Sequence, residues 1–208
     1  MWGLVAAERR RTADFLETLQ PEHWQARSLC ELWTVREAMG HINFIWNTTD
    51  EELMERVGRH GGDVPAASAE LGKELGRKAP EELIAGLRDN AELQKLPPGA
   101  RPIDALADVV LHTHDVAFPL GLEHPANADA TRLVLDEGVG DHRDHYNPSG
   151  GIDGLRFEAT DLDWSHGEGD LVRGKAIDLA SALHGRRAPV EALTGPGVQT
   201  FRQRFGNA

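Results

Sequence analysis

The chain has 208 residues, 22 of them basic and 34 acidic, and its formal net charge at pH 7 is −12. A surface this acidic repels phosphate groups, so neither nucleic acid nor an anionic membrane is expected as a partner. Hydrophobic residues make up 40% of the sequence and charged residues 27%, which indicates a globular protein rather than a disordered or fibrous one. No stretch resembles a secretory leader or reaches the roughly 18 apolar residues of a membrane span, and the single cysteine, Cys30, cannot form an intramolecular disulfide. We therefore expect a cytoplasmic protein.

The apolar residues of the first 140 positions recur mostly at helical spacing, which predicts an antiparallel helix bundle. The first helix is expected over residues 4–19. A second helix should begin at Thr34, because a threonine followed three residues later by Glu37 is typical of a capping box. It is expected to continue, with room for a kink, to just before Gly61. The stretch 59–78 contains four glycines and an irregular apolar pattern, which predicts a loop with at most a short helix.

The second half of the chain changes from helical to alternating patterns. The later elements predicted are, in chain order, a helix beginning at Pro80, helices over 102–118 and 133–139, strands over 155–160 and 171–174, a short helix over 175–184 and a strand over 190–193. The predicted fold class is α+β. A bundle of four main helices at residues 1–140 precedes a small α+β domain at residues 150–208.

One group of side chains in the predicted bundle indicates metal chemistry. Asp108 and His112 are four residues apart, so they project from one helix face with Cβ atoms about 6 Å apart, and His41 lies on the second predicted helix. Two imidazoles and a carboxylate suit zinc, nickel or ferrous iron, and three protein ligands leave positions open for water or substrate. Taken separately, the Asp–His spacing is typical of a surface ion pair, and a lone histidine on an apolar face is usually a hydrogen-bonded core residue. Their combination on neighbouring helices favours a metal site of catalytic type.

Three stretches of the sequence resemble one family. Residues 28–42, SLCELWTVREAMGHI, are similar to the signature slCpgWtVrdvvaHl of the mycothiol-dependent maleylpyruvate isomerase family, within the DinB-like metalloenzyme superfamily. Residues 108–117, DVVLHTHDVA, resemble a second signature of that family, ElvvHgwDla. Residues 155–160 and 174–187 resemble, more loosely, its small C-terminal α/β domain. The resemblance spans nearly the whole chain and implies a DinB-like four-helix bundle followed by that small domain.

The resemblance also implies a ligand set. His41, Asp108 and His112 correspond to the residues that hold a divalent metal in the family, usually zinc, and the donor types also allow nickel or iron. The usual acid in the family is glutamate, so Asp108 must reach the metal with a side chain that is one methylene shorter. This departure predicts that the helices lie slightly closer together or that a water fills the gap.

Two further residues are candidates for catalytic roles. Asp115 lies three residues beyond His112, where the family also has aspartate, and it can orient a ligand or stabilise local structure. Arg186 follows a short predicted helix, where it can contact a substrate carboxylate, as the resemblance implies, or complement the helix dipole. Cys30 is interpreted as a buried structural cysteine, since no nearby sequence feature favours the thiolate.

The function that the resemblance implies is that of a metal- and mycothiol-dependent isomerase or S-transferase. A metal-bound thiolate of mycothiol, a low-molecular-weight thiol, would attack a small electrophilic substrate. Two alternatives stay open: a non-catalytic, metal-binding, dimeric helical protein of the same fold, and a metal-dependent hydrolase that activates water. A thiol requirement would separate the first function from the hydrolase, and a reactive open metal position would separate it from the non-catalytic protein. A homodimer is compatible with the sequence.

Overall fold

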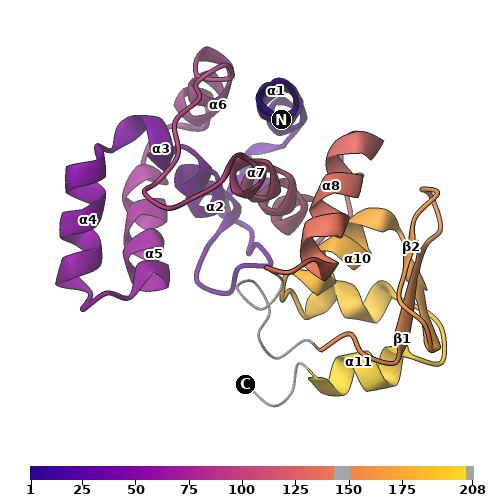
Figure 1. The fold of residues 1–208 in the computed structure, drawn as a ribbon. Coiled ribbons are helices and arrows are strands. Elements are labelled where there is room, and N and C mark those ends of the chain that lie inside the picture. Colours follow the sequence, from indigo (N-terminus) through magenta and orange to yellow (C-terminus); the bar gives the residue numbers. More distant parts are fainter. Residues whose placement is uncertain (143–150, 205–208) are drawn as a thin grey trace. The chain divides into compact units, whose positions relative to one another are not determined.

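The computed structural model describes residues 1–142 and 151–204 of the chain. The chain divides into two compact units, Met1–Ala126 and Asn127–Ala208. The first unit is helical, and the second combines helices with a three-stranded sheet (Figure 1). The predicted fold class, a helical domain followed by a small α/β domain, is confirmed. None of the described helices is both long and apolar enough to cross a membrane.

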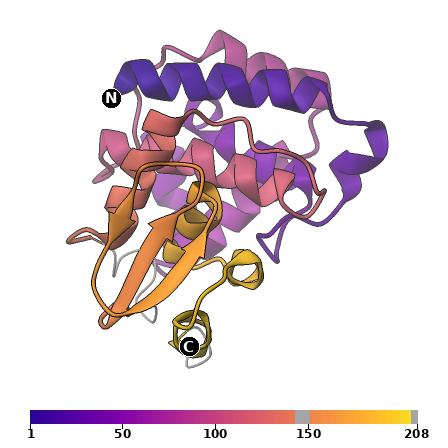
Figure 2. The same ribbon diagram turned by 90° about the vertical axis from the view of Figure 1, so that its right-hand side faces the viewer.

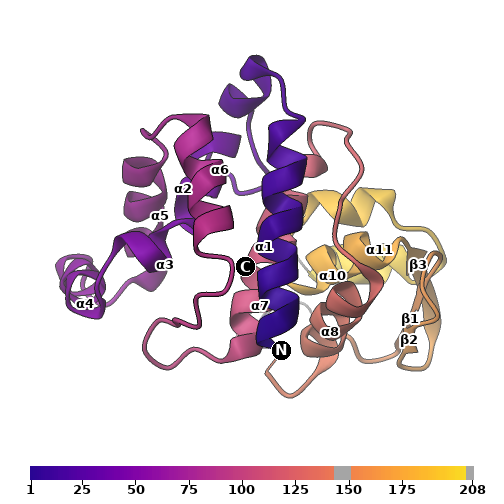
Figure 3. The ribbon, with the colours of Figure 1, turned by 90° about the horizontal axis from the view of Figure 1, so that it is seen from above.

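The first unit contains all three predicted metal ligands. Its elements are α1 (Trp2–Glu17), the 3₁₀ helix η1 (Pro21–Gln25), α2 (Val35–Ile42), α3 (Phe44–Asn47), α4 (Asp50–Arg59), α5 (Val64–Leu75), α6 (Pro80–Asp89) and α7 (Pro102–Ala117). Helices α1, α2, α6 and α7 form the bundle, in which α1 and α2 each pack against both α6 and α7 (Figure 3).

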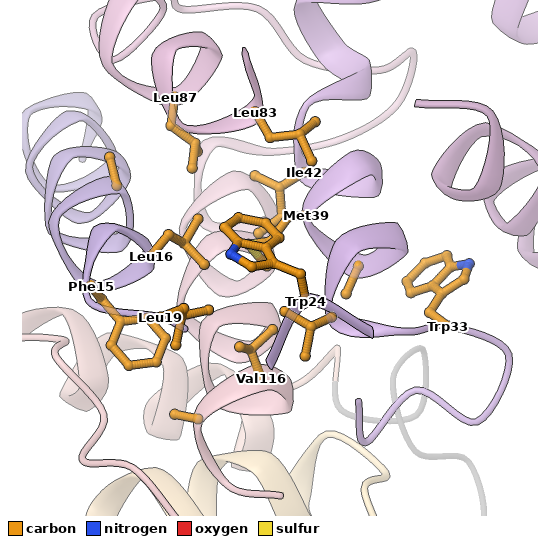
Figure 4. Packing of buried hydrophobic residues seen from close by; sticks show 14 of the residues in the cluster. Phe15, Leu16, Leu19, Trp24, Trp33, Met39, Ile42, Leu83, Leu87 and Val116 are labelled. Carbon is orange, nitrogen blue, oxygen red and sulfur yellow. The ribbon is translucent and has the colours of Figure 1, made fainter. Parts of the chain in front are cut away.

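A hydrophobic core lies between the helices of this bundle (Figure 4). Met39 of α2 and Val116 of α7 are both fully buried in it, and each shares a helix with a predicted metal ligand. Other large side chains of the core are Phe15, Leu16, Leu19, Trp24, Trp33, Ile42, Leu83 and Leu87. Because apolar burial is the main stabilising term, it fixes how each helix is rotated about its axis. The core thereby also sets the direction in which His41 and His112 project.

The start of α2 agrees with the sequence, but its length does not. The predicted capping box is confirmed: the Glu37 amide donates to Thr34 Oγ1 at 3.3 Å, and the Thr34 amide donates to the Glu37 carboxylate at 2.8 Å. The prediction of one long helix is wrong, because the chain leaves the helix at Asn43 and a second capping box, formed by Thr49 and Glu52, starts α4. Side chains of these types bind nearby backbone groups and so compete with continued helix.

The prediction of a loop over residues 59–78 is also wrong, since this stretch contains α5. The side chain of Asp63 caps the N-terminus of α5. Gly61 and Gly62 do lie in a turn, but Gly72 and Gly76 form a helix contact: a Cβ added to Gly40 of α2 would lie 2.5 Å from the carbonyl oxygen of Gly72 and 2.5 Å from the amide nitrogen of Gly76. Helices α2 and α5 therefore cross at a distance that only glycine permits.

The second unit is built around a small sheet. Its elements are α8 (Ala128–Val139), β1 (Leu155–Ala159), β2 (Ser165–His166), β3 (Asp170–Gly174), α10 (Ala176–Leu183), the 3₁₀ helix η2 (Ala188–Ala192) and α11 (Val198–Arg204). Strand β1 lies in the middle, antiparallel to β2 and parallel to β3 (Figure 2). The buried ring of Phe157 on β1 contacts that of Phe201 on α11. The predicted strand over 190–193 is wrong, because this segment mostly belongs to η2, whose first turn contains Pro189.

Helix α8 belongs with this second unit rather than with the bundle of the predicted 1–140 domain. It packs closely against α10 at Gly138, where an added Cβ would lie 3.0 Å from the side chains of Leu183 and His184. The indole nitrogen of Trp164 donates to Asp136 of α8 at 2.8 Å. The predicted start of the second domain at residue 150 lies outside the described residues.

Candidate metal centre

The three side chains predicted as metal ligands lie together in the first unit. His41 belongs to α2, and Asp108 and His112 belong to α7. Oδ1 of Asp108 lies 3.2 Å from Nε2 of His41 and 3.4 Å from Nε2 of His112. All three ligand atoms lie within 4.8 Å of one another. The packing of α2 against α7 thus brings together groups that are far apart in the sequence.

Contacts from several segments hold the ring of His41. Trp33 stacks on it with ring centroids 4.8 Å apart and an interplanar angle of 25°, and Phe44 stacks on it at 5.4 Å and 28°. Oγ of Ser68, on α5, lies 3.0 Å from Nδ1 of His41. With Nδ1 engaged in this way, Nε2 is the nitrogen that faces Asp108.

The ring of His112 is held by a buried carboxylate. Nδ1 of His112 donates to Oδ2 of Asp115 at 2.8 Å, and the side chain of Asp115 is 0% exposed. The thiol of Cys30 donates to the same oxygen at 3.1 Å. A carboxylate that accepts from Nδ1–H leaves the Nε2 lone pair available for a metal. Cys30 is thus partly exposed and adjacent to the site, unlike the buried structural cysteine that the sequence predicts.

Neighbouring groups of the site shift the pKa values of Asp108 and His112 in opposite directions. Burial raises the pKa of Asp108, but the nearby His41 and the hydrogen bonds with both imidazoles outweigh this effect and hold the pKa below its ordinary value. Burial lowers the pKa of His112, whereas the neighbouring Cys30 and the hydrogen bonds with Asp108 and Asp115 outweigh this effect and raise the pKa well above its ordinary value. The side chain of Asp108 is 34% exposed and those of His41 and His112 are 10% exposed. The site is therefore accessible mainly on the side of Asp108.

The donor set fits a divalent metal. In a tetrahedral zinc site with bonds of about 2.0–2.2 Å, neighbouring ligand atoms lie about 3.3–3.6 Å apart. The separations of 3.2 and 3.4 Å around Oδ1 of Asp108 are close to that range. The shorter aspartate therefore reaches both imidazoles from α7. Two imidazoles and a carboxylate suit nickel and ferrous iron as well as zinc.

Arg186, the other residue predicted to be catalytic, belongs to the second unit. Its Nη1 donates to the carbonyl oxygen of His184, just beyond the end of α10, at 3.2 Å. Basic side chains commonly bind carbonyl groups at the C-terminal end of a helix. A contact between Arg186 and a substrate stays a prediction.

Sequence reasoning missed two neighbours of His41, Ser68 and Phe44. Phe44 could have been found, because it lies three residues after His41 in the long helix that the sequence predicts, and side chains at this spacing are neighbours on a helix. Ser68 has no such local signal, since it approaches His41 from another helix.

Comparisons with known proteins give one family match and one likeness of fold. Residues 5–101 match the family described as mycothiol maleylpyruvate isomerase N-terminal domain. Two solved structures match over 94% of this chain and 91% of theirs at 15% sequence identity. One is a mycothiol-dependent maleylpyruvate isomerase, with a TM-score of 0.56, and the other is a histidine-to-alanine mutant of such an enzyme, with a TM-score of 0.57. At this identity the likeness concerns the fold. No curated protein sequence matches the chain significantly.

Proposed function

We propose that this chain is an enzyme that uses mycothiol and a divalent metal. The reason is that, through residues 5–101, it belongs to the mycothiol maleylpyruvate isomerase family. Its substrate is a small electrophile, which it isomerises or to which it transfers the thiol. His41, Asp108 and His112 are the proposed metal ligands. Zinc is the first candidate for this donor set, and nickel and ferrous iron are the alternatives.

The observation that carries this proposal is the meeting of two imidazole nitrogens with one carboxylate oxygen. Nε2 of His41 and Nε2 of His112 both face Oδ1 of Asp108. Their Nδ1 atoms are engaged by Ser68 and Asp115, as is usual for histidines that bind metals. Three protein ligands leave room for a thiol or a water, which is typical of a catalytic site rather than a structural one.

The residues of the site have distinct tasks in this function. A divalent metal, when bound, would supply positive charge that keeps a thiol sulfur in its nucleophilic thiolate form at neutral pH. Asp108 contributes one negative charge and lies at the exposed side of the site. The rings of Trp33 and Phe44 cover His41 and limit its contact with water. Asp115 holds His112 with Nε2 directed at Asp108.

Both proposed reactions begin in the same way. The thiolate of mycothiol forms a sulfur–carbon bond with the electrophile. In isomerisation the attacked double bond becomes single, rotates, and is restored when the sulfur leaves. In transfer the sulfur–carbon bond is kept and another group leaves with the electron pair.

The metal content of the purified protein tests the ligand set. We expect about one zinc per chain in the wild type and its loss in His41→Ala and in His112→Ala. His166→Ala is the matched control, because His166 is exposed on β2 of the second unit and its removal should leave the metal in place. A wild-type protein that neither contains nor takes up zinc, nickel or iron would contradict the proposal.

A turnover assay then separates the classes of function. Conversion of maleylpyruvate, or of another activated alkene, should require both the metal and mycothiol. Turnover of a hydrolysable substrate without any thiol would favour a metal-dependent hydrolase. Stoichiometric metal without turnover in either assay would favour a non-catalytic metal-binding protein.

A further inference from the structure

The aromatic rings around His41 fix the plane of its imidazole but not its direction. Stacking by Trp33 and Phe44 acts on the faces of the ring. These faces are nearly unchanged when the ring makes half a turn about its Cβ–Cγ bond, although this turn exchanges Nδ1 with Cδ2 and Nε2 with Cε1. In the turned ring a carbon atom would replace Nε2 opposite Asp108. Another group must therefore select the orientation that ligation requires.

Ser68 of α5 distinguishes the two orientations. Its Oγ lies 3.0 Å from Nδ1 of His41, and Cδ2 could not form this hydrogen bond in its place. The position of Ser68 depends on the glycine crossing of the two helices, because Gly72 lies one turn further along α5 and Gly40 directly precedes His41. The contact that fixes α5 against α2 thus also sets the direction of His41.

The two proposed imidazole ligands have chemically different partners at Nδ1. An ionised Asp115 can only accept a hydrogen bond, so it holds the proton of His112 on Nδ1 and keeps the Nε2 lone pair available. The hydroxyl of Ser68 can donate or accept, so its bond to His41 persists whichever nitrogen carries the proton. A carboxylate partner also makes an imidazole a stronger ligand.

We propose that Ser68 is a positioning residue that selects the orientation in which His41 binds the metal through Nε2. As a neutral partner, it leaves His41 the more easily released of the two imidazoles. This inference rests on the proposed function, since it concerns the same metal site. Loss of the Ser68 hydroxyl should lower zinc affinity roughly 10-fold, and loss of the Asp115 carboxylate should lower it up to about 100-fold.

The test compares the wild type with Ser68→Ala, Ser68→Thr and Asp115→Ala. Zinc affinity is measured by competition with a chromophoric chelator, and the ligating nitrogens are identified by NMR of protein with isotope-labelled histidine. Ser68→Ala should bind zinc more weakly than the wild type, and part of its His41 should not ligate the metal, because a carbon atom faces Asp108 in the turned ring. Ser68→Thr keeps the hydroxyl, so its affinity and its ligating nitrogen should match the wild type. Val64→Ala, one turn earlier on α5 with an exposed side chain, is the control.

The outcomes separate this inference from the proposed function. A wild type that binds no metal would overturn both. Zinc binding by Ser68→Ala with wild-type affinity and through Nε2 alone would overturn the role of Ser68 and leave the proposed function intact. Equal losses in Ser68→Thr and Ser68→Ala, with Nε2 as the ligand in both, would assign the effect to packing and also overturn it.

Discussion

Replacing Gly40 by alanine tests the close crossing of α2 and α5 that supports the metal site. The added Cβ would lie 2.5 Å from the carbonyl oxygen of Gly72 and 2.5 Å from the amide nitrogen of Gly76. Both atoms belong to the backbone and cannot rotate away, so the two helices would have to separate by about 1 Å to reach ordinary contact distances. Overpacking of this kind costs about 1–3 kcal/mol, here at the upper end. The better helix propensity of alanine returns about 1 kcal/mol, which leaves a net destabilisation of about 2 kcal/mol.

Gly58→Ala provides the matched control for Gly40→Ala. Gly58 also lies in a helix, α4, but an added Cβ would meet no atom within 4 Å. This variant should gain about 0.5–1 kcal/mol, so urea unfolding should shift in opposite directions for the two substitutions. Zinc affinity should fall only in Gly40→Ala, because this change moves His41 relative to Ser68. The close crossing would be refuted if Gly40→Ala matched the wild type in both its urea midpoint and its zinc affinity.

Three substitutions test local contacts. Thr34→Ala should lower the free energy of unfolding by about 1 kcal/mol, because it removes the side-chain cap of α2, and an unchanged urea midpoint would contradict this role. The pKa of His184 is lowered to about 4, mainly by burial, so below pH 6.5 the unfolded chain binds a proton that the folded chain does not. The free energy of unfolding should therefore fall by about 3 kcal/mol as the pH falls from 6.5 to 4. His184→Gln should depend less on pH over this range, and an equal pH dependence in the variant and the wild type would exclude His184 as its cause. Asp108→Glu should weaken zinc binding roughly tenfold, because an extra methylene moves the carboxylate by about 1.5 Å. Zinc affinity is measured by competition with a chelator, and tighter binding by the variant would show that the site prefers the longer acid.

The elements that the sequence predicts well are those with local signals. Thr34 and Glu37 mark the start of α2, and prolines mark the starts of α6 and α7. The alternation over 155–160 marks β1. In each case the residues that favour the element lie within it or at its ends. Neighbours in the sequence are then enough to predict the structure.

The stretch 59–78 shows where local signals fail. A glycine inside a helix costs about 1 kcal/mol relative to alanine, so several glycines in one stretch favour a loop. However, Gly72 within α5 and Gly76 at its end lie where α2 comes closest, and larger residues could not occupy these positions. The gain from this contact is non-local, because the other half of it is Gly40. A sequence pattern along α5 alone cannot distinguish the two uses of glycine.

The candidate site also combines features that have a local sequence signal with features that have none. The spacing of Asp108 and His112 is visible within one helix, and His41 is visible as a histidine on a neighbouring predicted helix that also ends a family signature. The partner of His41 is not visible, because Ser68 acts through a contact between α2 and α5. The meeting of these three side chains could therefore be predicted from the sequence, but the contact of His41 with Ser68 could not.

The support of the proposed metal site extends beyond its ligands to α4. Arg56 of α4 binds Glu70 at 2.9 Å and Glu74 at 2.6 Å on α5, and its side chain is only 18% exposed. Since α5 carries Ser68 and meets α2 at the glycine crossing, a shift of α5 would change the direction of His41 without changing any ligand. Most exposed ion pairs contribute little to stability, but here one guanidinium binds two carboxylates of the same helix, and such a network can hold the helix in position. A fall in zinc affinity in Arg56→Met, with all three ligands intact, would therefore show that the ligand geometry depends on α5.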